Sequence, residues 1–147
     1  MIRKEGAGAL GRLAPSYYLH DGVVPRTRLP EVMRQVTAIA RAHDLMIGNL
    51  FHAGDGNLHP TILFDPKRPG VLERVMAAGE EILRACVAAG GSITGEHGVG
   101  IEKRDYMRWV FSEADLEAMR QLQAASGAPS AGASADLSVH PRPGVGS

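Results

Sequence analysis

Residues 46–64 read MIGNLFHAGDGNLHPTILF, and this stretch decides the fold because two apolar runs in it are separated by a short glycine-rich segment. The runs, residues 46–52 and 58–64, are rich in aliphatic and aromatic side chains and have the length of strands. The five residues between them, 53–57, contain the Asp-Gly and Gly-Asn steps that are typical of tight turns. We therefore predict a β-hairpin, or a tight glycine loop, over this stretch.

Helical patterns flank the hairpin on both sides. Residues 29–44 place apolar side chains on one face at helical spacing, and Pro30 suits the first turn of such a helix. Residues 69–89 show the same pattern and are followed by two glycines, which commonly end a helix. We predict one helix over each of these ranges.

Two short β-branched runs, residues 21–25 and 92–94, are predicted to be strands. Residues 1–18 show no sustained period, and we expect them to form an irregular lead-in. The resulting order of strand, helix, strand, strand, helix, strand is that of a split βαβ unit. The sequence therefore predicts an α+β, ferredoxin-like sandwich in which the helices cover one face of the sheet.

The C-terminal part of the chain divides into a helix and a tail. Ser112 and Asp115 form a capping-box pattern before a third, shorter helix. Of the 22 residues from 126 to 147, sixteen are Gly, Pro, Ser or Ala. Such a composition buries too little apolar surface to offset the entropy lost on ordering. We expect a single domain over residues 1–125 and a disordered tail over residues 126–147.

The composition restricts the classes of function. The chain has 147 residues with 16 basic and 16 acidic side chains, so it has no net charge that would favour nucleic acid or an acidic membrane. No apolar run approaches the roughly 20 residues that a membrane span requires. Cys86 is the only cysteine, which excludes an internal disulfide and a multi-cysteine zinc site. We expect a cytoplasmic protein with no nucleic-acid partner and no membrane span.

Three of the six histidines and one glutamate lie in two glycine-rich segments. We call residues 52–59 (HAGDGNLH) the first glycine segment and residues 95–100 (GEHGVG) the second glycine segment. If the first one joins antiparallel strands, His52 and His59 can point to one face at the separation of cross-strand neighbours. Glu96 could then add a carboxylate oxygen. Two imidazoles and a carboxylate with a vacant position are the ligand set of a catalytic zinc, although other divalent ions accept it.

His97 follows Glu96 directly, so the two side chains point in different directions if the backbone is extended there. One of them can bind a metal while the other faces a substrate, and a neutral imidazole can act as a base near pH 7. The alternative is that His52 and His59 are ordinary strand residues with satisfied hydrogen bonds.

The two glycine segments together resemble the C-terminal domain of FAD-linked oxidases, particularly the glycolate oxidase flavin subunit and the related D-lactate and D-2-hydroxyglutarate dehydrogenases. Residues 11–18 (GRLAPSYY) and 21–26 (DGVVPR) are similar to the glycolate oxidase branch, so the resemblance covers about residues 2–125. The resemblance implies the ferredoxin-like cap domain that sits over the flavin in this family.

The same resemblance implies roles for individual residues. It makes His52, His59 and Glu96 the metal ligands and His97 the base. It also places Arg3 where related dehydrogenases hold the substrate carboxylate. The implied cofactors are FAD and a divalent metal, Zn or Mn. The implied reaction is oxidation of a small 2-hydroxy acid, glycolate or D-lactate, to the 2-oxo acid, with hydride transfer to FAD.

The family binds FAD mainly through a separate N-terminal domain, and nothing in these 147 residues corresponds to it. We therefore expect a fragment of a longer flavoprotein, or a subunit whose partner carries FAD, that does not complete the reaction alone. The family's usual closing segment is replaced after Ala125, which we interpret as a frame-shifted or misplaced gene end. Two alternatives stay open: a metal-dependent hydrolase that activates water, and a remnant that binds metal without catalysis.

Overall fold

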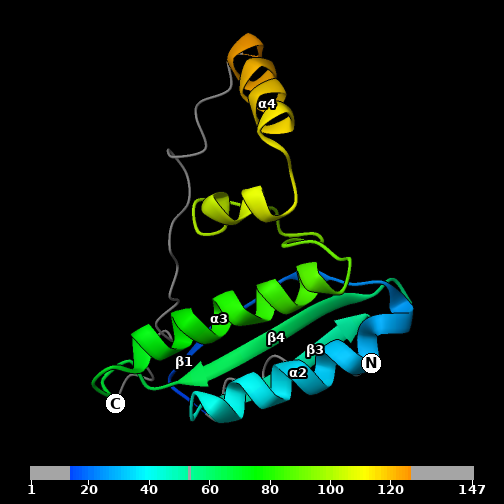
Figure 1. The fold of residues 1–147 in the computed structure, drawn as a ribbon. Coiled ribbons are helices and arrows are strands. Elements are labelled where there is room, and N and C mark those ends of the chain that lie inside the picture. The colour runs from blue at the N-terminus through cyan, green and yellow to red at the C-terminus, as the bar shows by residue number, and fades with distance from the viewer. Residues whose placement is uncertain (1–13, 53, 127–147) are drawn as a thin grey trace, which may run out of the picture.

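The computed structural model of the chain describes residues 14–52 and 54–126 (Figure 1). Arg3 and residues 127–147, which carry the substrate-binding prediction and nearly all of the predicted tail, lie outside the described residues. The elements in chain order are β1 (Ser16–Leu19), β2 (Gly22–Val23), the 3₁₀-helix η1 (Arg26–Arg28), α2 (Leu29–Ala42), β3 (Met46–His52), β4 (Asn57–Phe64), α3 (Val71–Ala88), the 3₁₀-helix η2 (Arg104–Trp109) and α4 (Glu113–Ala125).

Strand β4 is the centre of an antiparallel sheet. Strand β3 pairs along one edge of β4, which forms the predicted hairpin. Strands β1 and β2 share the other edge of β4 in a single register, and an antiparallel bridge joins Val23 of β2 to Ser92. The order across the sheet is therefore Ser92, then β1 and β2, then β4, then β3. This order confirms the predicted α+β, ferredoxin-like sandwich.

Two predictions about short strands were wrong in detail. Residues 16–19 belong to strand β1, although we expected an irregular lead-in through residue 18, because they pair with the far end of β4. The segment 92–94 forms only a single bridge at Ser92, although we expected a strand. The Thr94 hydroxyl and the N–H groups of the three residues that follow, Gly95, Glu96 and His97, donate to the carboxylate of Asp21, so the chain leaves the sheet after Ser92.

The break between β1 and β2 has its cause in the central strand. The register that places Leu19 opposite Thr61 also places residue 20 opposite Pro60. Proline has no N–H to donate, so the ladder loses one hydrogen bond at this point. The N–H of His20 still donates to the carbonyl of Pro60 at 2.9 Å. The segment from residue 16 to residue 23 therefore follows β4 as one extended strand.

Helices α2 and α3 lie side by side across one face of the sheet (Figure 1). They confirm the helices predicted over residues 29–44 and 69–89, with slightly shorter bounds. The core between helices and sheet consists of Val24, Leu29, Val32, Val36, Leu58, Ile62, Phe64, Val71, Val75, Ala78, Ile82 and Cys86. Burial raises the pKa of the Cys86 thiol to about 11, as expected of an inert core cysteine.

The C-terminal helix begins with the predicted capping box. The Ser112 side chain accepts a hydrogen bond from the N–H of Asp115 at 3.2 Å, and the Asp115 carboxylate accepts one from the N–H of Ser112 at 3.0 Å. Helix α4 lies away from the sheet and contacts η2 (Figure 1). Over residues 14–52 and 54–126, no helix has both the length and the apolar character needed to cross a bilayer.

The hairpin loop depends on Gly56. This residue has a φ of +78°, and a Cβ atom there would lie 2.1 Å from the carbonyl oxygen of Val24. The close approach is held by a hydrogen bond of 3.0 Å from the N–H of Val24 to the carbonyl of Gly56. The loop that carries the first glycine segment is therefore tied to the end of the neighbouring strand.

We expect Gly56→Ala to lower the free energy of unfolding by about 2–4 kcal/mol, since the variant combines a disfavoured φ with a backbone clash. Urea denaturation followed by circular dichroism measures the change. Gly54→Ala is the matched control, because a Cβ at Gly54 meets nothing within 4 Å. Equal losses of stability in the two variants would contradict this role of Gly56.

His20 is buried between the sheet and α3 without a polar partner. Both of its ring nitrogens are buried and lack a hydrogen-bond partner among the described residues. Its ring meets the ring of Tyr18 edge-on at 4.5 Å, and a Cβ on Gly79 of α3 would lie 2.5 Å from its Nε2. Burial, assisted by the positive charge of Lys103, lowers the pKa of His20 to about 3.

The buried His20 should make stability fall as the pH falls from about 6.5 toward 3. In that window the unfolded chain binds a proton at this histidine and the folded chain does not, so acid favours unfolding. The slope from one such group approaches about 1.4 kcal/mol per pH unit. Urea unfolding at pH 4 to 7.5 should show this slope in the wild type and lose that part of it in His20→Phe. Parallel pH curves for the two proteins would count against a neutral, buried His20.

Candidate metal centre

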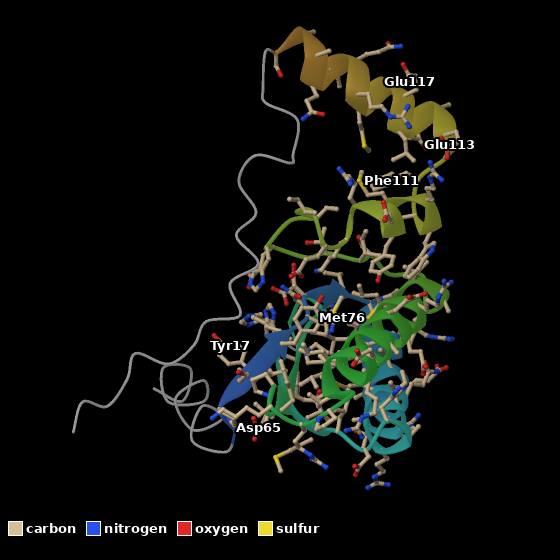
Figure 2. All side chains as sticks on the ribbon, turned by 90° about the vertical axis from the view of Figure 1, so that its left-hand side faces the viewer. Tyr17, Asp65, Met76, Phe111, Glu113 and Glu117 are labelled. Carbon is tan, nitrogen blue, oxygen red and sulfur yellow. The ribbon has the colours of Figure 1, made fainter. Side chains whose placement is uncertain are left out.

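The residues of the candidate site lie on the face of the sheet away from α2 and α3. Leu58 and Ile62 of β4 are in the core beneath the helices, so the alternating residues Asn57 and His59 belong to the opposite face. Figure 2 shows that Tyr17 of β1 also points away from the helices, on the same side of the sheet. One face of the sheet therefore packs the core and the other carries the polar residues.

The hairpin brings the two histidines of the first glycine segment together. His52 pairs with Asn57, and His59 lies two residues further along β4, so the two imidazoles are diagonal neighbours. Their ring centroids are 5.2 Å apart and their planes meet at 87°. The loop is one residue shorter than expected, because Asn57 is already the first residue of β4.

The second glycine segment places Glu96 beside these histidines. Oε1 of Glu96 lies 3.1 Å from Nε2 of His59. His52, His59 and Glu96 each offer one ligand atom, and these three atoms lie within 4.8 Å of one another. Two imidazole nitrogens and one carboxylate oxygen at this spacing are a donor set that fits a divalent cation such as Zn²⁺ or Mn²⁺.

His97 lies beside this set. Its ring stacks on that of His59 at 5.2 Å with an angle of 22° between the planes, and its Nε2 lies 3.5 Å from Oε1 of Glu96. The His97 side chain is 46% exposed, whereas that of His59 is only 10% exposed. The structure therefore brings together four of the five predicted site residues, all except Arg3. The imidazole of His59 is buried, and that of His97 is accessible.

Asp21 is the residue of this site that the sequence analysis missed. Its Oδ2 accepts hydrogen bonds of 2.9–3.0 Å from the hydroxyl of Thr94 and from the N–H groups of Gly95, Glu96 and His97. Burial would raise the pKa of Asp21, but these four hydrogen bonds outweigh it and lower the pKa to about 2. The charged carboxylate therefore determines the path of the second glycine segment.

Lys103 supports Asp21 from the other side. It is buried, and its Nζ donates to the carbonyl oxygen of Asp21 at 3.0 Å. Burial lowers the pKa of Lys103, while the nearby negative charge of Asp21 acts in the opposite direction. Asp21 begins the segment DGVVPR that carries part of the family resemblance, but that segment gave it no role, and Lys103 simply follows the second glycine segment.

Asn57 and Gly95 form the contact between the two glycine segments. A Cβ atom on Gly95 would lie 2.8 Å from Oδ1 of Asn57 and 2.7 Å from Cγ2 of Val23. Only a residue without a side chain allows the second glycine segment to approach the sheet this closely. Oδ1 of Asn57 is buried and has no hydrogen-bond partner within the described part of the chain.

The chain matches the family described as FAD linked oxidases, C-terminal domain, over residues 1–126. It is 44% identical over 123 residues to the glycolate oxidase subunit GlcD of Escherichia coli K12, an alignment that covers 84% of this chain and 25% of that protein. It is 40% identical over 123 residues to GlcD of Bacillus subtilis, which covers 84% of this chain and 26% of the relative.

The similarity extends to a second group of relatives. The chain is 34% identical over 107 residues to a probable mitochondrial D-lactate dehydrogenase of Danio rerio, with coverage of 73% of this chain and 22% of that protein. The chain therefore spans about a quarter of the length of the curated relatives it matches.

Proposed function

Since the chain belongs to the family of FAD-linked oxidase C-terminal domains, we propose that it is the metal- and substrate-binding part of an FAD-dependent 2-hydroxy acid oxidoreductase. Relatives named glycolate oxidase subunit and D-lactate dehydrogenase support glycolate or D-lactate as the substrate. The observation that carries the proposal is the convergence of His52, His59 and Glu96 next to His97.

In this proposal His52, His59 and Glu96 hold one divalent cation, Zn or Mn. When bound, the cation supplies a Lewis acid that lowers the pKa of the substrate hydroxyl. The Glu96 side chain is 55% exposed, so the ligand set faces the side from which a substrate arrives. His59 is buried beneath it and keeps the set in place.

His97 is the proposed base that accepts the proton of the substrate hydroxyl. Its ring is held against His59 and remains accessible, which suits a group that must touch the substrate while its neighbours hold the cation. Arg3, which lies outside the described residues, is proposed to bind the substrate carboxylate.

FAD is proposed to be bound by a separate domain or subunit, where it would supply the hydride acceptor. The sheet face that carries the site is the proposed contact surface. Tyr17, Met46 and Leu50 are exposed there, at 46%, 56% and 38%. Large exposed apolar residues around a site are typical of a surface that another domain covers.

The metal site can be tested on the full 147-residue chain. After treatment with a chelator, the wild type should bind one Zn²⁺ per chain in a calorimetric titration. His52→Ala and Glu96→Ala should each weaken binding by at least about 100-fold, since loss of a ligand exceeds the 10–100-fold effect of residues that only orient ligands.

His43→Ala is the control for a general effect of losing an imidazole. His43 lies at the C-terminal end of α2, and its Nε2 is 2.9 Å from Glu81 of α3, in contact with neither glycine segment. It should bind Zn²⁺ like the wild type. Unchanged affinity in both site variants would disprove the proposed ligand set.

The redox role requires a flavin donor domain. We expect that a chimaera, in which the full chain replaces the matching C-terminal segment of Escherichia coli GlcD, loses its flavin absorbance anaerobically on addition of glycolate or D-lactate. His97→Asn in the chimaera should slow this reduction by about 10²–10⁴-fold, the usual contribution of a general base. A folded chimaera that retains FAD and metal but is reduced by neither acid would reject the proposed reaction.

A further inference from the structure

The two carboxylate oxygens of Asp21 have different surroundings. Oδ2 accepts the four hydrogen bonds from residues 94–97. Oδ1 is buried and has no hydrogen-bond partner within residues 14–52 and 54–126. A buried charged oxygen without a hydrogen-bond donor destabilises the folded state, so its presence needs a structural or functional explanation.

A second buried polar atom without a hydrogen-bond partner in the described part of the chain faces this oxygen across the sheet. Nδ1 of His59 lies 4.0 Å from Oδ1 of Asp21, and it is buried without a hydrogen-bond partner in the described part of the chain. Asp21 is 1% exposed and His59 is 8% exposed. Two buried polar atoms, one an obligatory acceptor and the other able to donate, thus face each other at 4.0 Å, which is beyond hydrogen-bond distance.

The strand register explains why they face each other. Leu19 of β1 pairs with Thr61 of β4, and Gly22 of β2 pairs with Leu58 of β4. The same register places Asp21, which lies between β1 and β2, directly opposite His59. Side chains in such opposite positions point to the same face of the sheet. The juxtaposition is therefore imposed by the backbone and does not depend on the rotation of one side chain.

The other nitrogen of His59 faces the proposed cation. Nε2 lies 3.1 Å from Oε1 of Glu96, which belongs to the proposed ligand set. A histidine that binds a metal through one nitrogen needs the other nitrogen protonated, and a carboxylate at that second nitrogen fixes both the tautomer and the ring orientation. The Asp21 carboxylate lies 4.0 Å from Nδ1 of His59, and Glu96 of the ligand set lies 3.1 Å from Nε2.

We propose that Asp21 is a positioning residue, which holds His59 as the tautomer with its proton on Nδ1 and so keeps the lone pair of Nε2 directed at the divalent cation. The proposal rests on the metal site of the proposed function and extends it to a residue outside both glycine segments. The same carboxylate fixes the backbone of Glu96 and His97 through Oδ2, so one side chain orients parts of both segments.

A second set of three residues also has the spacing of a cation site. Single ligand atoms of Asp21, His59 and His97 also lie within 4.8 Å of one another. A cation held between Oδ1 of Asp21 and Nδ1 of His59, which lie 4.0 Å apart, requires the proton of His59 to be on Nε2. The two arrangements therefore predict opposite tautomers of the same histidine.

The test measures the tautomer and the metal affinity on the full chain. In Zn²⁺-loaded protein at pH 8, long-range ¹H–¹⁵N spectra should show the proton of His59 on Nδ1, with the signals assigned from a His59→Gln variant. In Asp21→Asn the amide oxygen remains with the four donors and the NH₂ group turns to Nδ1 of His59, which disfavours the tautomer that binds the cation through Nε2. Co²⁺ titrated into the chain should bind this variant about 10–100-fold more weakly than the wild type.

Thr94→Val is the matched control for a structural effect. It removes one of the four donors to Oδ2 and leaves Oδ1 and His59 unchanged. We expect its His59 tautomer to be that of the wild type and its Co²⁺ affinity to fall less than that of Asp21→Asn. If Asp21→Asn binds Co²⁺ no more weakly than Thr94→Val, the proposal is wrong.

The tautomer of the wild type decides the proposal even if Asp21→Asn fails to fold. A His59 proton on Nε2 in the wild type would overturn it and favour Asp21 as a direct ligand. A wild type that binds neither Zn²⁺ nor Co²⁺ would overturn the metal site of the proposed function, and this proposal with it.

Discussion

Four hydrogen bonds converge on a single oxygen of Asp21, and the arrangement of the site follows from them. They join a strand near the N-terminus to a segment more than 70 residues later in the chain. The N–H groups of Gly95, Glu96 and His97 all donate to this side chain and not to a neighbouring strand. The backbone therefore leaves the sheet after Ser92 and turns Glu96 toward His59.

The residues of the central strand β4 have different roles on the two faces of the sheet. Alternate residues of β4 pack under α2 and α3, which stabilises the domain, while the others point to the face with the polar cluster. Because β4 is paired on both edges, His59 is held between a strand that supplies Asp21 and a strand that supplies His52. The residues of the candidate site are thus part of the paired sheet itself. In our proposal a flavin-carrying partner binds to the face of the sheet that carries them.

Local patterns in the sequence were sufficient for the larger elements. The helices, the hairpin and the capping box at Ser112 were predicted correctly because helical periodicity, turn residues and capping depend on neighbours within a few positions. The proximity of His52 and His59 was also predictable, since a short hairpin loop sets its own register. Strand β1 was missed because Ser16–Leu19 has no distinctive alternation, and it is a strand only through its pairing with β4.

The sequence by itself determined which residue types are available for chemistry and which stretches are helix or hairpin, because these depend on local backbone preferences. Only the tertiary structure decided that Asp21 lies opposite His59, that its carboxylate holds the second glycine segment, and that the polar cluster is on the face away from the helices. The pairing of strands distant in the chain is set by the packing of the whole sheet against its helices. A one-residue change of that register would have turned Asp21 into the core, and no local sequence pattern encodes the difference.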